Sequence, residues 1–385
     1  MKNVMAGVDP GNKNIKVYVD GMKNPLSIEN VLYDVTLINA QTDLNTNTLS
    51  TLSLFKKKQS DPLNLLDVTI RSNGKTIGRK YVGNIALKHG GELRSAKKIK
   101  SADNDTFFAM IAALAFPMVE IGKEVKRKVC LGTCLPISEF LHKDNYINHE
   151  SRLVGKHEIM FNNPYFENAS VAIEISKDDL IIVPEGTSAL LNIVTDDNGE
   201  ILNDYEKLQD RIFIIADIGA NKSDIIAVRE FEPIEEMMTF FDRGIIIAIE
   251  RVIETLRRMR PDYSITKNDL DYHIRERNSK LIDGENEWDV SSYADNEFKV
   301  ISKELANRIN DLIQKIPSTV RSYIARIVLT GGSSEILHKY IVEELDSYKI
   351  MLSESCLFDN VLGCYKAAKQ ANSQKKDVPE KNGKE

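Results

Sequence analysis

Two short stretches of the chain place a carboxylate and a glycine two residues apart at the end of an apolar run. Asp9 follows the apolar residues 3–8, and Asp217 follows the apolar run 212–216. A second β-branched run resumes shortly after each glycine. This pattern predicts a strand, a tight turn and a second strand, with backbone N–H groups of the turn facing an anion. Because the design occurs twice, we predict two similar halves that face each other across a cleft.

The first copy alone has an ordinary alternative explanation. The sequence Asp9-Pro10-Gly11-Asn12 is also well suited to a plain β-turn. The prediction of a functional site therefore rests on the repetition of the motif and not on either copy by itself.

Two further turns follow buried strands and precede helices. Pro184-Glu185-Gly186 comes after the apolar run 181–183, and Gly331-Gly332-Ser333 comes after the run 326–330. Residues at the carboxyl ends of such strands line the crevices where open α/β sheets bind ligands. The start of the following helix adds backbone N–H groups and a positive dipole end. The alternative role for Glu185 is that of an acidic residue in the first turn of its helix.

Hydrophobic periodicity predicts the elements that carry these turns. Besides the strands already named, we expect strands at 15–19, 32–38, 49–55, 68–70, 75–82, 125–131, 158–161 and 171–176, and a strand pair around 280–290. The strand at 125–131 is expected to break at Gly132. We expect helices at 106–119, 142–153, 187–194, 245–259, 266–277, 302–316 and 336–345, and a final helix that follows Gly363 and ends at about 371. Residues 372–385 are polar and charged and are expected to form a disordered tail.

Bulk properties restrict the class of protein. A chain of 385 residues with 42% hydrophobic and 28% charged residues is typical of a two-domain globular protein. The net charge of −6 argues against direct nucleic-acid binding. The longest apolar stretch, 107–119, is too short to span a membrane, and no secretory signal is visible, so a cytoplasmic location is expected. The four cysteines are expected to be buried structural thiols.

Five glycine-containing turns are expected along the chain, in the order 9–16, 184–186, 217–224, 331–333 and 358–363. With this order the sequence resembles the actin / DnaK-type chaperone / sugar kinase superfamily, and within it the bacterial actin-like plasmid-partition ATPases of the ParM type. The resemblance covers residues 1 to about 371. It implies an α/β, actin-like (ribonuclease H-like) two-domain fold with a nucleotide cleft between the domains. Domain I would comprise 1–187 and 355–371, with a variable insertion at about 30–104, and domain II would comprise 188–354.

Three strings carry the more specific part of this resemblance. Asp9 to Lys16 is similar to the family's first phosphate loop, Asp-x-Gly-x-x-x-x-Lys. Leu131 to Pro136 resembles a Thr-Gly-Leu-Pro stretch of ParM-like proteins, with Cys134 replacing the usual glycine. Phe358 to Gly363 is similar to a Phe-Ala-Asn-Val-x-Gly string near the C-terminus. The chain departs from the family at 219–222, where relatives have a Gly-Gly-Thr-Thr-like run.

The resemblance also implies roles for individual residues. Asp9 and Asp217 would hold Mg²⁺ through its waters, and Glu185 would place the attacking water. Gly331 to Ser333 would pass close to the adenosine and α-phosphate. The implied nucleotide-binding residues are Gly11, Asn12, Lys13, Asn14, Lys16, Gly219, Ala220, Asn221, Lys222, Gly331, Gly332 and Ser333. Lys267 and Arg275 are possible purine contacts that we leave unassigned.

The function implied is that of a filament-forming ATPase that uses ATP or GTP with Mg²⁺. It would polymerise with itself head to tail, hydrolyse the nucleotide afterwards, and segregate plasmid DNA through a ParR-like DNA-binding adaptor, without direct nucleic-acid or membrane contact. The alternatives are a small-molecule kinase of the same superfamily, a non-polymerising chaperone-like ATPase, and a phage or bacterial filament without a DNA cargo. The chaperone-like alternative normally needs a substrate-binding domain, for which the residues after 371 leave no room.

Overall fold

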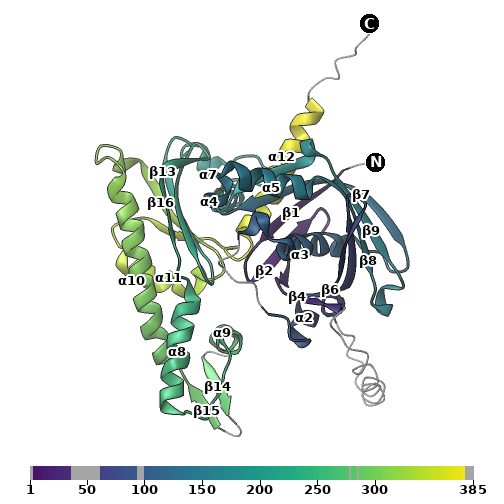
Figure 1. The fold of residues 1–385 in the computed structure, drawn as a ribbon. Helices are drawn as coiled ribbons and strands as arrows, with labels where there is room; N and C mark the ends of the chain where they lie inside the picture. The colour runs from purple at the N-terminus through teal and green to yellow at the C-terminus, as the bar shows by residue number, and fades with distance from the viewer. Residues whose placement is uncertain (1–2, 36–60, 93–98, 277–278, 284–285, 378–385) are drawn as a thin grey trace. The chain divides into compact units, whose positions relative to one another are not determined.

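The computed structural model describes residues 3–35, 61–92, 99–276, 279–283 and 286–377, which form two compact units (Figure 1). Unit 1 comprises Met1–Pro184, Asp197–Gly199 and Val361–Glu385. Unit 2 comprises Glu185–Asp196 and Glu200–Asn360. The chain therefore passes from one unit to the other directly before Glu185 and directly after Asn360, and between these points it enters unit 1 only at Asp197–Gly199.

The centre of unit 1 is a sheet that starts from an antiparallel meander. The strands run in the order β3-β2-β1-β7, with β10 pairing to the carboxyl-terminal part of β7. Both β7 and β10 run parallel to β1. The bounds are β1 Val4–Pro10, β2 Asn14–Val19, β3 Leu26–Glu29, β7 Glu124–Leu135 and β10 Leu180–Pro184.

The amino-terminal half of β7 pairs instead with β9 and extends the sheet away from this centre. The extension runs β9-β8-β5-β6-β4 and brings the sheet to ten strands. It contains most of the strands at 30–104 that the sequence marks as an insertion. The bounds are β4 Leu32–Asp34, β5 Asp67–Ser72, β6 Lys75–Val82, β8 Gly155–Phe161 and β9 Ser170–Ile175.

The helix α3 (Asn104–Ala115) covers one face of the sheet of unit 1. Asp103 caps this helix, since its carboxylate accepts a hydrogen bond from the N–H of Thr106 at 3.0 Å. The apolar helix is buried along most of its length and ends in a 3-10 turn, Phe116–Met118, where Pro117 cannot donate a backbone hydrogen bond. The other helices of this unit are α2 Asn84–Lys88, α4 Ile137–Phe140 and α5 Lys143–Leu153.

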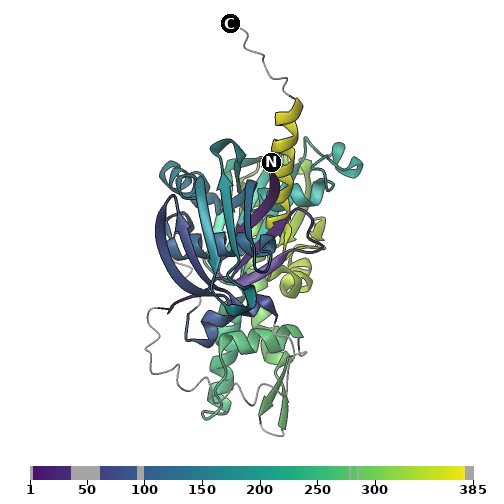
Figure 2. The same cartoon turned by 90° about the vertical axis from the view of Figure 1, so that its right-hand side faces the viewer.

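The long helix α12 (Asp359–Asp377) covers the opposite face of this sheet, and Figure 2 shows it (yellow) alongside the first strand (purple). Gly7 and Gly132 are paired neighbours on β1 and β7 beneath it. A Cβ atom on Gly132 would lie 1.8 Å from the carbonyl oxygen of Cys364, and one on Gly7 would lie 2.3 Å from that of Val361. The two glycines therefore allow the helix backbone to lie directly on the strands.

Unit 2 repeats the strand order of the centre of unit 1. An antiparallel meander of β11, β12 and β13 leads to β16 and β17, which run parallel to β11, in the order β13-β12-β11-β16-β17. The prediction of two similar halves is thereby confirmed at the level of topology. The bounds are β11 Ile212–Ile218, β12 Ser223–Arg229, β13 Glu232–Phe241, β16 Ile324–Thr330 and β17 Ile350–Leu352.

Three helices cover one face of this second sheet, and the start of α6 lies against the other. α8 (Ile245–Met259), α10 (Ser291–Lys315) and α11 (Ser334–Glu344) pack on the β11 residues of even number from Ile212 to Ile218. α6 (Thr187–Val194) follows Gly186, which lies against Ile215 and Ile226 of the opposite face. The remaining elements are α7 Asn203–Glu206, α9 Lys267–Glu276, β14 Lys280–Asp283 and β15 Asn286–Asp289.

Two expected boundaries were wrong. β7 does not break at Gly132 but continues to Leu135, because Gly132 pairs with Gly7 and the strand is needed between β1 and β10. α10 begins at Ser291 and not at 302, because Ala294, Phe298 and Ile301 continue its buried stripe. The predicted strand 49–55 lies outside the described residues.

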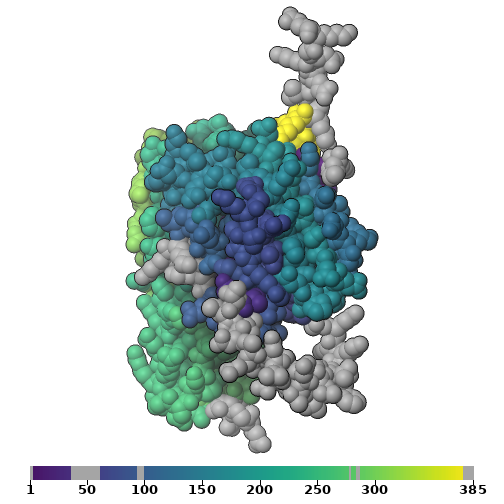
Figure 3. Space-filling view, turned by 45° about the vertical axis from the view of Figure 1, so that its right-hand side comes forward, coloured from purple at the N-terminus to yellow at the C-terminus, as the bar shows by residue number. Residues whose placement is uncertain are grey.

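The last helix is also longer than expected. α12 continues through 372–377, which the sequence assigned to a disordered tail. Lys375 there donates a hydrogen bond to the carboxylate of Asp179 at 2.8 Å, and extending an existing helix is far easier than nucleating one. Figure 3 shows the last described turn of α12 (yellow) exposed at the surface. Within the described residues no helix combines the length and hydrophobicity that a membrane crossing requires.

Candidate functional site

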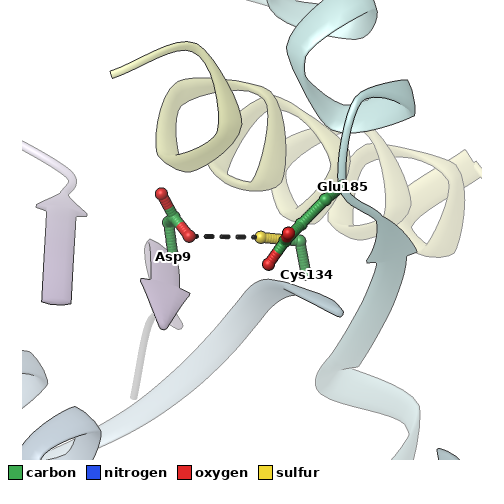
Figure 4. A group of neighbouring side chains, drawn as sticks. All are labelled: Asp9, Cys134 and Glu185. Carbon is green, nitrogen blue, oxygen red and sulfur yellow. Dashed lines mark hydrogen bonds between the residues drawn. The ribbon is translucent and has the colours of Figure 1, made fainter. Parts of the chain in front are cut away.

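Asp9 stands at the carboxyl end of β1, on the face of the sheet that α12 covers. It pairs in register with Lys16 on β2, whose ammonium group donates a hydrogen bond to Oδ2 at 2.9 Å. The thiol of Cys134 on β7 donates to Oδ1 at 3.7 Å, as the dashed line in Figure 4 shows. Both oxygens of the carboxylate therefore have a donor from a neighbouring strand.

The pKa of Asp9 lies below its ordinary value of 3.8. Burial by itself raises the pKa of this carboxyl, but the positive charges of Lys16 and Lys100 and the hydrogen bonds from Lys16 and Cys134 outweigh burial. Asp9 is therefore ionised at neutral pH and carries a negative charge at the end of β1.

The turn after Asp9 is tied back by a residue that the sequence did not single out. The side chain of Asn30, which is buried, donates to the carbonyl of Gly11 at 3.0 Å, and its backbone N–H donates to the carbonyl of Lys13 at 2.8 Å. Asn14 is held in turn by a hydrogen bond from its amide to Ser27 at 2.9 Å. The two hydrogen bonds from Asn30 direct the carbonyl groups of Gly11 and Lys13 towards that residue, so the groups of the turn that could face an anion are its backbone N–H groups.

Asp217 occupies the equivalent position at the end of β11 in unit 2. Its Oδ2 accepts a hydrogen bond from the side-chain amide of Asn360 at 2.7 Å. Gly331 lies against its other oxygen, because a Cβ atom there would be 2.3 Å from Oδ1. Gly331 also has a φ of +87°, so both its backbone conformation and its contact with Asp217 exclude a side chain.

The second turn and the Gly331–Ser333 turn are held together within unit 2. The hydroxyl of Ser333 donates to the carbonyl of Gly219 at 3.1 Å, and its N–H donates to the carbonyl of Ile218 at 2.9 Å. The carbonyl of Ala220 accepts the N–H of Ile246, at the start of α8, at 2.9 Å. The structure thus brings two of the predicted nucleotide-binding segments into one cluster.

Lys222 is directed to the sheet by its contacts. Its ammonium group lies 3.3 Å from the carboxylate of Asp224 and 4.7 Å from the ring centre of Phe240, and these two residues are paired on β12 and β13. Asp224 also occupies the register position that Lys16 has in unit 1, opposite the first carboxylate of its hairpin. In unit 2 the positive charge is therefore neutralised beside the turn, which leaves Asn221 and backbone N–H groups as the donors that could face phosphate.

Glu185 is the first residue after β10, whose Pro184 pairs with Leu135 and whose Val183 pairs with Cys134 (Figure 4). The alternative role as a first-turn acid of α6 does not fit, because this helix begins at Thr187 with Gly186 as its N-cap. The carboxylate instead extends from the end of a strand that is bonded to the strand carrying Cys134.

The structure brings the predicted residues together in two groups, one in each unit. The first comprises Asp9, residues 11–14 and Lys16, and the second comprises Asp217, residues 219–222 and 331–333. Both groups offer carboxylates, the ligand type that Mg²⁺ prefers. Because each oxygen of Asp9 already accepts a hydrogen bond, the donor set suits an ion that keeps its waters.

The sequence missed three contacts that support these groups. Asn30 holds the first turn, and Asn360 holds Asp217. Arg275 of α9 donates to the carbonyl of Gly332 at 2.8 Å and to the carboxylate of Asp271 at 2.9 Å. Asn360 lay within a string matched to the family, which could have marked it, whereas no local pattern pointed to Asn30.

No protein-family model matches the chain, and no curated protein sequence is significantly similar to it. Solved structures do match its fold. The actin-like protein Alp7A has a TM-score of 0.74 at 15% identity, with 97% of this chain and 98% of that chain covered. ParM from Bacillus thuringiensis with ATP has a TM-score of 0.68 at 17% identity, with 97% and 100% covered.

A 15-stranded ParM filament from Clostridium botulinum matches with a TM-score of 0.69 at 17% identity, covering 96% of this chain and 100% of that chain. These matches span nearly the whole length of this chain and of each matched chain, and both units of this chain contain the duplicated meander described above. The predicted fold is confirmed: the chain has the two-domain α/β fold of actin-like proteins.

Proposed function

We propose that this protein is a nucleotide-dependent, filament-forming actin-like ATPase that segregates plasmid DNA through a DNA-binding adaptor. The observation that carries the proposal is the pair of carboxylate-bearing hairpins, Asp9–Lys16 and Asp217–Asp224, at equivalent positions of two sheets whose central strands follow the same order. The fold likeness to a ParM with ATP and to a ParM filament supports it. Unit 1 would be domain I and unit 2 domain II.

The two turns would grip the phosphates of ATP or GTP between the domains. Residues 11–14 and 219–222 would donate backbone N–H groups, and Lys16 would add a compact positive charge. Gly331 to Ser333 would lie under the nucleoside and α-phosphate, with Gly331 packed against Asp217 and Ile218. Lys222 would act indirectly, by holding its turn to Asp224 and Phe240.

Hydrolysis of this kind depends on positioning and on stabilising negative charge. Asp9 and Asp217 would hold Mg²⁺ through water, and the ion would neutralise charge on the phosphates. Glu185 would orient the attacking water and accept its proton, since the residue follows directly from β10 and precedes the first turn of α6. Each of these roles belongs to a side chain at the carboxyl end of a strand.

Polymerisation would proceed head to tail, because contacts between two different faces of a subunit that do not close into a ring give open filaments. The γ-phosphate would favour one arrangement of the two domains and so stabilise the polymer. The net charge of −6 suits a cytoplasmic protein that reaches DNA through an adaptor and not by direct contact.

The hydrolysis assay should be designed to separate this proposal from a small-molecule kinase of the same fold. We expect phosphate release from ATP without any acceptor, at a rate per molecule that rises with protein concentration as polymer forms. The variant Asp9→Asn, which removes a charge next to Lys16, should abolish this activity, whereas Glu158→Ala, at an exposed position of β8, should not. A rate that depends on an added acceptor and is independent of protein concentration would support the kinase instead.

A further inference from the structure

The first two residues of α12 form a buried polar network in unit 2. Asp359 is fully buried, and its carboxylate accepts four hydrogen bonds from β16, from the segment after β17 and from α6. The donors are Thr330 at 2.7 Å, Ser353 at 2.8 Å, Ser355 at 2.6 Å and Asn192 at 2.9 Å. With this many donors the start of α12 is fixed to the carboxyl ends of two strands of the second sheet.

Asn360 uses this fixed position to contact Asp217. Its side-chain oxygen accepts the hydroxyl of Ser188 at 2.7 Å and the N–H of Gly186 at 3.3 Å. Its side-chain nitrogen donates to Oδ2 of Asp217 at 2.7 Å. Because two donors face the oxygen and a carboxylate faces the nitrogen, the amide has only one orientation that satisfies all its partners.

The carboxylate of Asp217 is thereby confined from two sides. Asn360 holds Oδ2, and the backbone of Gly331 lies against Oδ1. A carboxylate that is held in this way keeps its rotamer when it binds a ligand, which is how residues around metal sites raise metal affinity. Asn360 is also the last residue of unit 2, and α12 continues from Val361 into unit 1 without a break.

We propose that Asn360 is a positioning residue for Asp217, which orients this carboxylate for Mg²⁺-nucleotide and couples its orientation to the first turn of α12. The inference rests on the proposed function, because it takes Asp217 as the residue that meets the ion. It adds a residue to which the sequence assigned no role and gives a physical reason for an asparagine at this point of the helix.

The test measures the affinity for a fluorescent ATP analogue by anisotropy as Mg²⁺ is varied, with no hydrolysis required. We expect Asn360→Ser to raise the Mg²⁺ concentration for half-maximal binding about 10- to 100-fold, the effect usual for partners of metal ligands. Affinity without Mg²⁺ should change far less. Asn360→Asp, which places a carboxylate against Asp217, should have a larger effect than Asn360→Ser.

A double-mutant cycle with Asp217→Asn separates positioning from general loss of structure. If Asn360 acts through Asp217, Asn360→Ser should have little further effect on the Mg²⁺ requirement once Asp217 is replaced. An additive effect, or an unchanged Mg²⁺ requirement in a folded Asn360→Ser protein, would overturn the inference. Ser188→Ala, which removes one donor to the oxygen of Asn360, should give a smaller shift in the same direction and serves if Asn360→Ser does not fold.

Nucleotide binding by the wild-type protein tests the proposed function separately from the role of Asn360. Binding of the analogue that depends on Mg²⁺ in the wild type, with an unchanged requirement in Asn360→Ser, would retain the proposed function and reject only the positioning role. A wild-type protein that binds no nucleotide at any Mg²⁺ concentration would reject both.

Discussion

The two hairpins differ in the residue that is paired with the first carboxylate, which is Lys16 opposite Asp9 and Asp224 opposite Asp217. This difference suggests different roles for Lys16 and Lys222. Lys16 lies beside Asp9 on the strand after the first turn, whereas Asp224 takes that position after the second turn and neutralises Lys222. The family resemblance alone placed Lys222 among the nucleotide-binding residues. The contacts of Lys222 with Asp224 and Phe240 favour a structural task for it, whereas Lys16 is paired with Asp9 itself, the carboxylate of the first turn.

Glu185 is the residue on which hydrolysis should depend most. We predict that Glu185→Ala slows phosphate release about 100-fold or more, the usual range for loss of a general base. Nucleotide-dependent assembly should remain, because neither turn is altered, and the polymer should persist longer. Phosphate release and light scattering recorded on the same sample would show both effects.

Glu185→Gln, which keeps the size of the side chain, should be slow as well, whereas Glu158→Ala on the exposed side of β8 should hydrolyse at the wild-type rate. A Glu185→Ala protein with the wild-type rate of phosphate release would show that another group positions the water.

At the scale of elements, the contact between α12 and the sheet of unit 1 depends on two glycines of the sheet, Gly7 and Gly132, which have no side chain. We predict that Gly132→Ala lowers the free energy of unfolding by about 3 kcal/mol, the upper part of the range for overpacked sites. The reason is that a Cβ atom there would lie 1.8 Å from the carbonyl oxygen of Cys364, so the helix must move. Urea unfolding followed by circular dichroism gives this value.

Gly74→Ala is the matched control, because a Cβ atom at Gly74 meets no atom within 4 Å and only its φ of +79° opposes the change. That strain should cost about 1–2 kcal/mol. Equal losses in the two variants would show that α12 does not depend on close contact with β7.

The helix α5 contains a buried histidine that should make stability depend on pH. Burial, together with the positive charges of Arg152 and Lys100, lowers the pKa of His149 from 6.5 to about 3. Above pH 6.5 the ring is neutral in both the folded and the unfolded chain. Below this pH the unfolded chain takes up a proton that the folded chain does not, so stability falls as the pH falls towards 3.

We predict that between pH 7 and pH 5 the wild-type protein loses about 2 kcal/mol more of its free energy of unfolding than His149→Gln does. Urea titrations of both proteins at the two pH values provide the comparison. His157, whose pKa burial also lowers, is present in both proteins and therefore cancels. The same loss in both proteins would show that His149 is protonated without difficulty in the folded state.

Local spacing predicted much of this architecture. The intervals from Asp9 to Lys16 and from Asp217 to Asp224 were enough to predict both hairpins, and period and length predicted α6 and α8 to the residue. The failures have a common physical cause. Gly132 was interpreted as a strand break because its sequence neighbours do not show that a helix more than 200 residues away needs its small size.

The same limit applies to the candidate site. The residues of each turn follow from sequence, since they are neighbours in the chain. Asn360 meets Asp217 across 143 residues, and no local pattern indicates such a contact. Asn30 likewise holds the first turn from 19 residues away, in a segment whose composition is typical of ordinary loops.

At the scale of the whole molecule, the two sheets share the order of their central strands. The chain that joins them leaves unit 1 at Pro184 and, apart from Asp197–Gly199, returns to it at Val361. The return lies within α12, directly after the residue that bonds Asp217. In the proposed function, nucleotide would bind to both hairpins, and any change at Asp217 would reach unit 1 through a continuous helix. Polymer formation would then report the state of the nucleotide.

The most direct measurement is right-angle light scattering after ATP and Mg²⁺ are added to the purified protein at tens of micromolar. We predict a rise in scattering that requires the triphosphate, is absent with Asp217→Asn, and decays as phosphate is released. Electron microscopy of the same sample should show filaments. No rise with either ATP or GTP over a range of salt and protein concentrations would contradict the proposal that this protein is a nucleotide-dependent filament former.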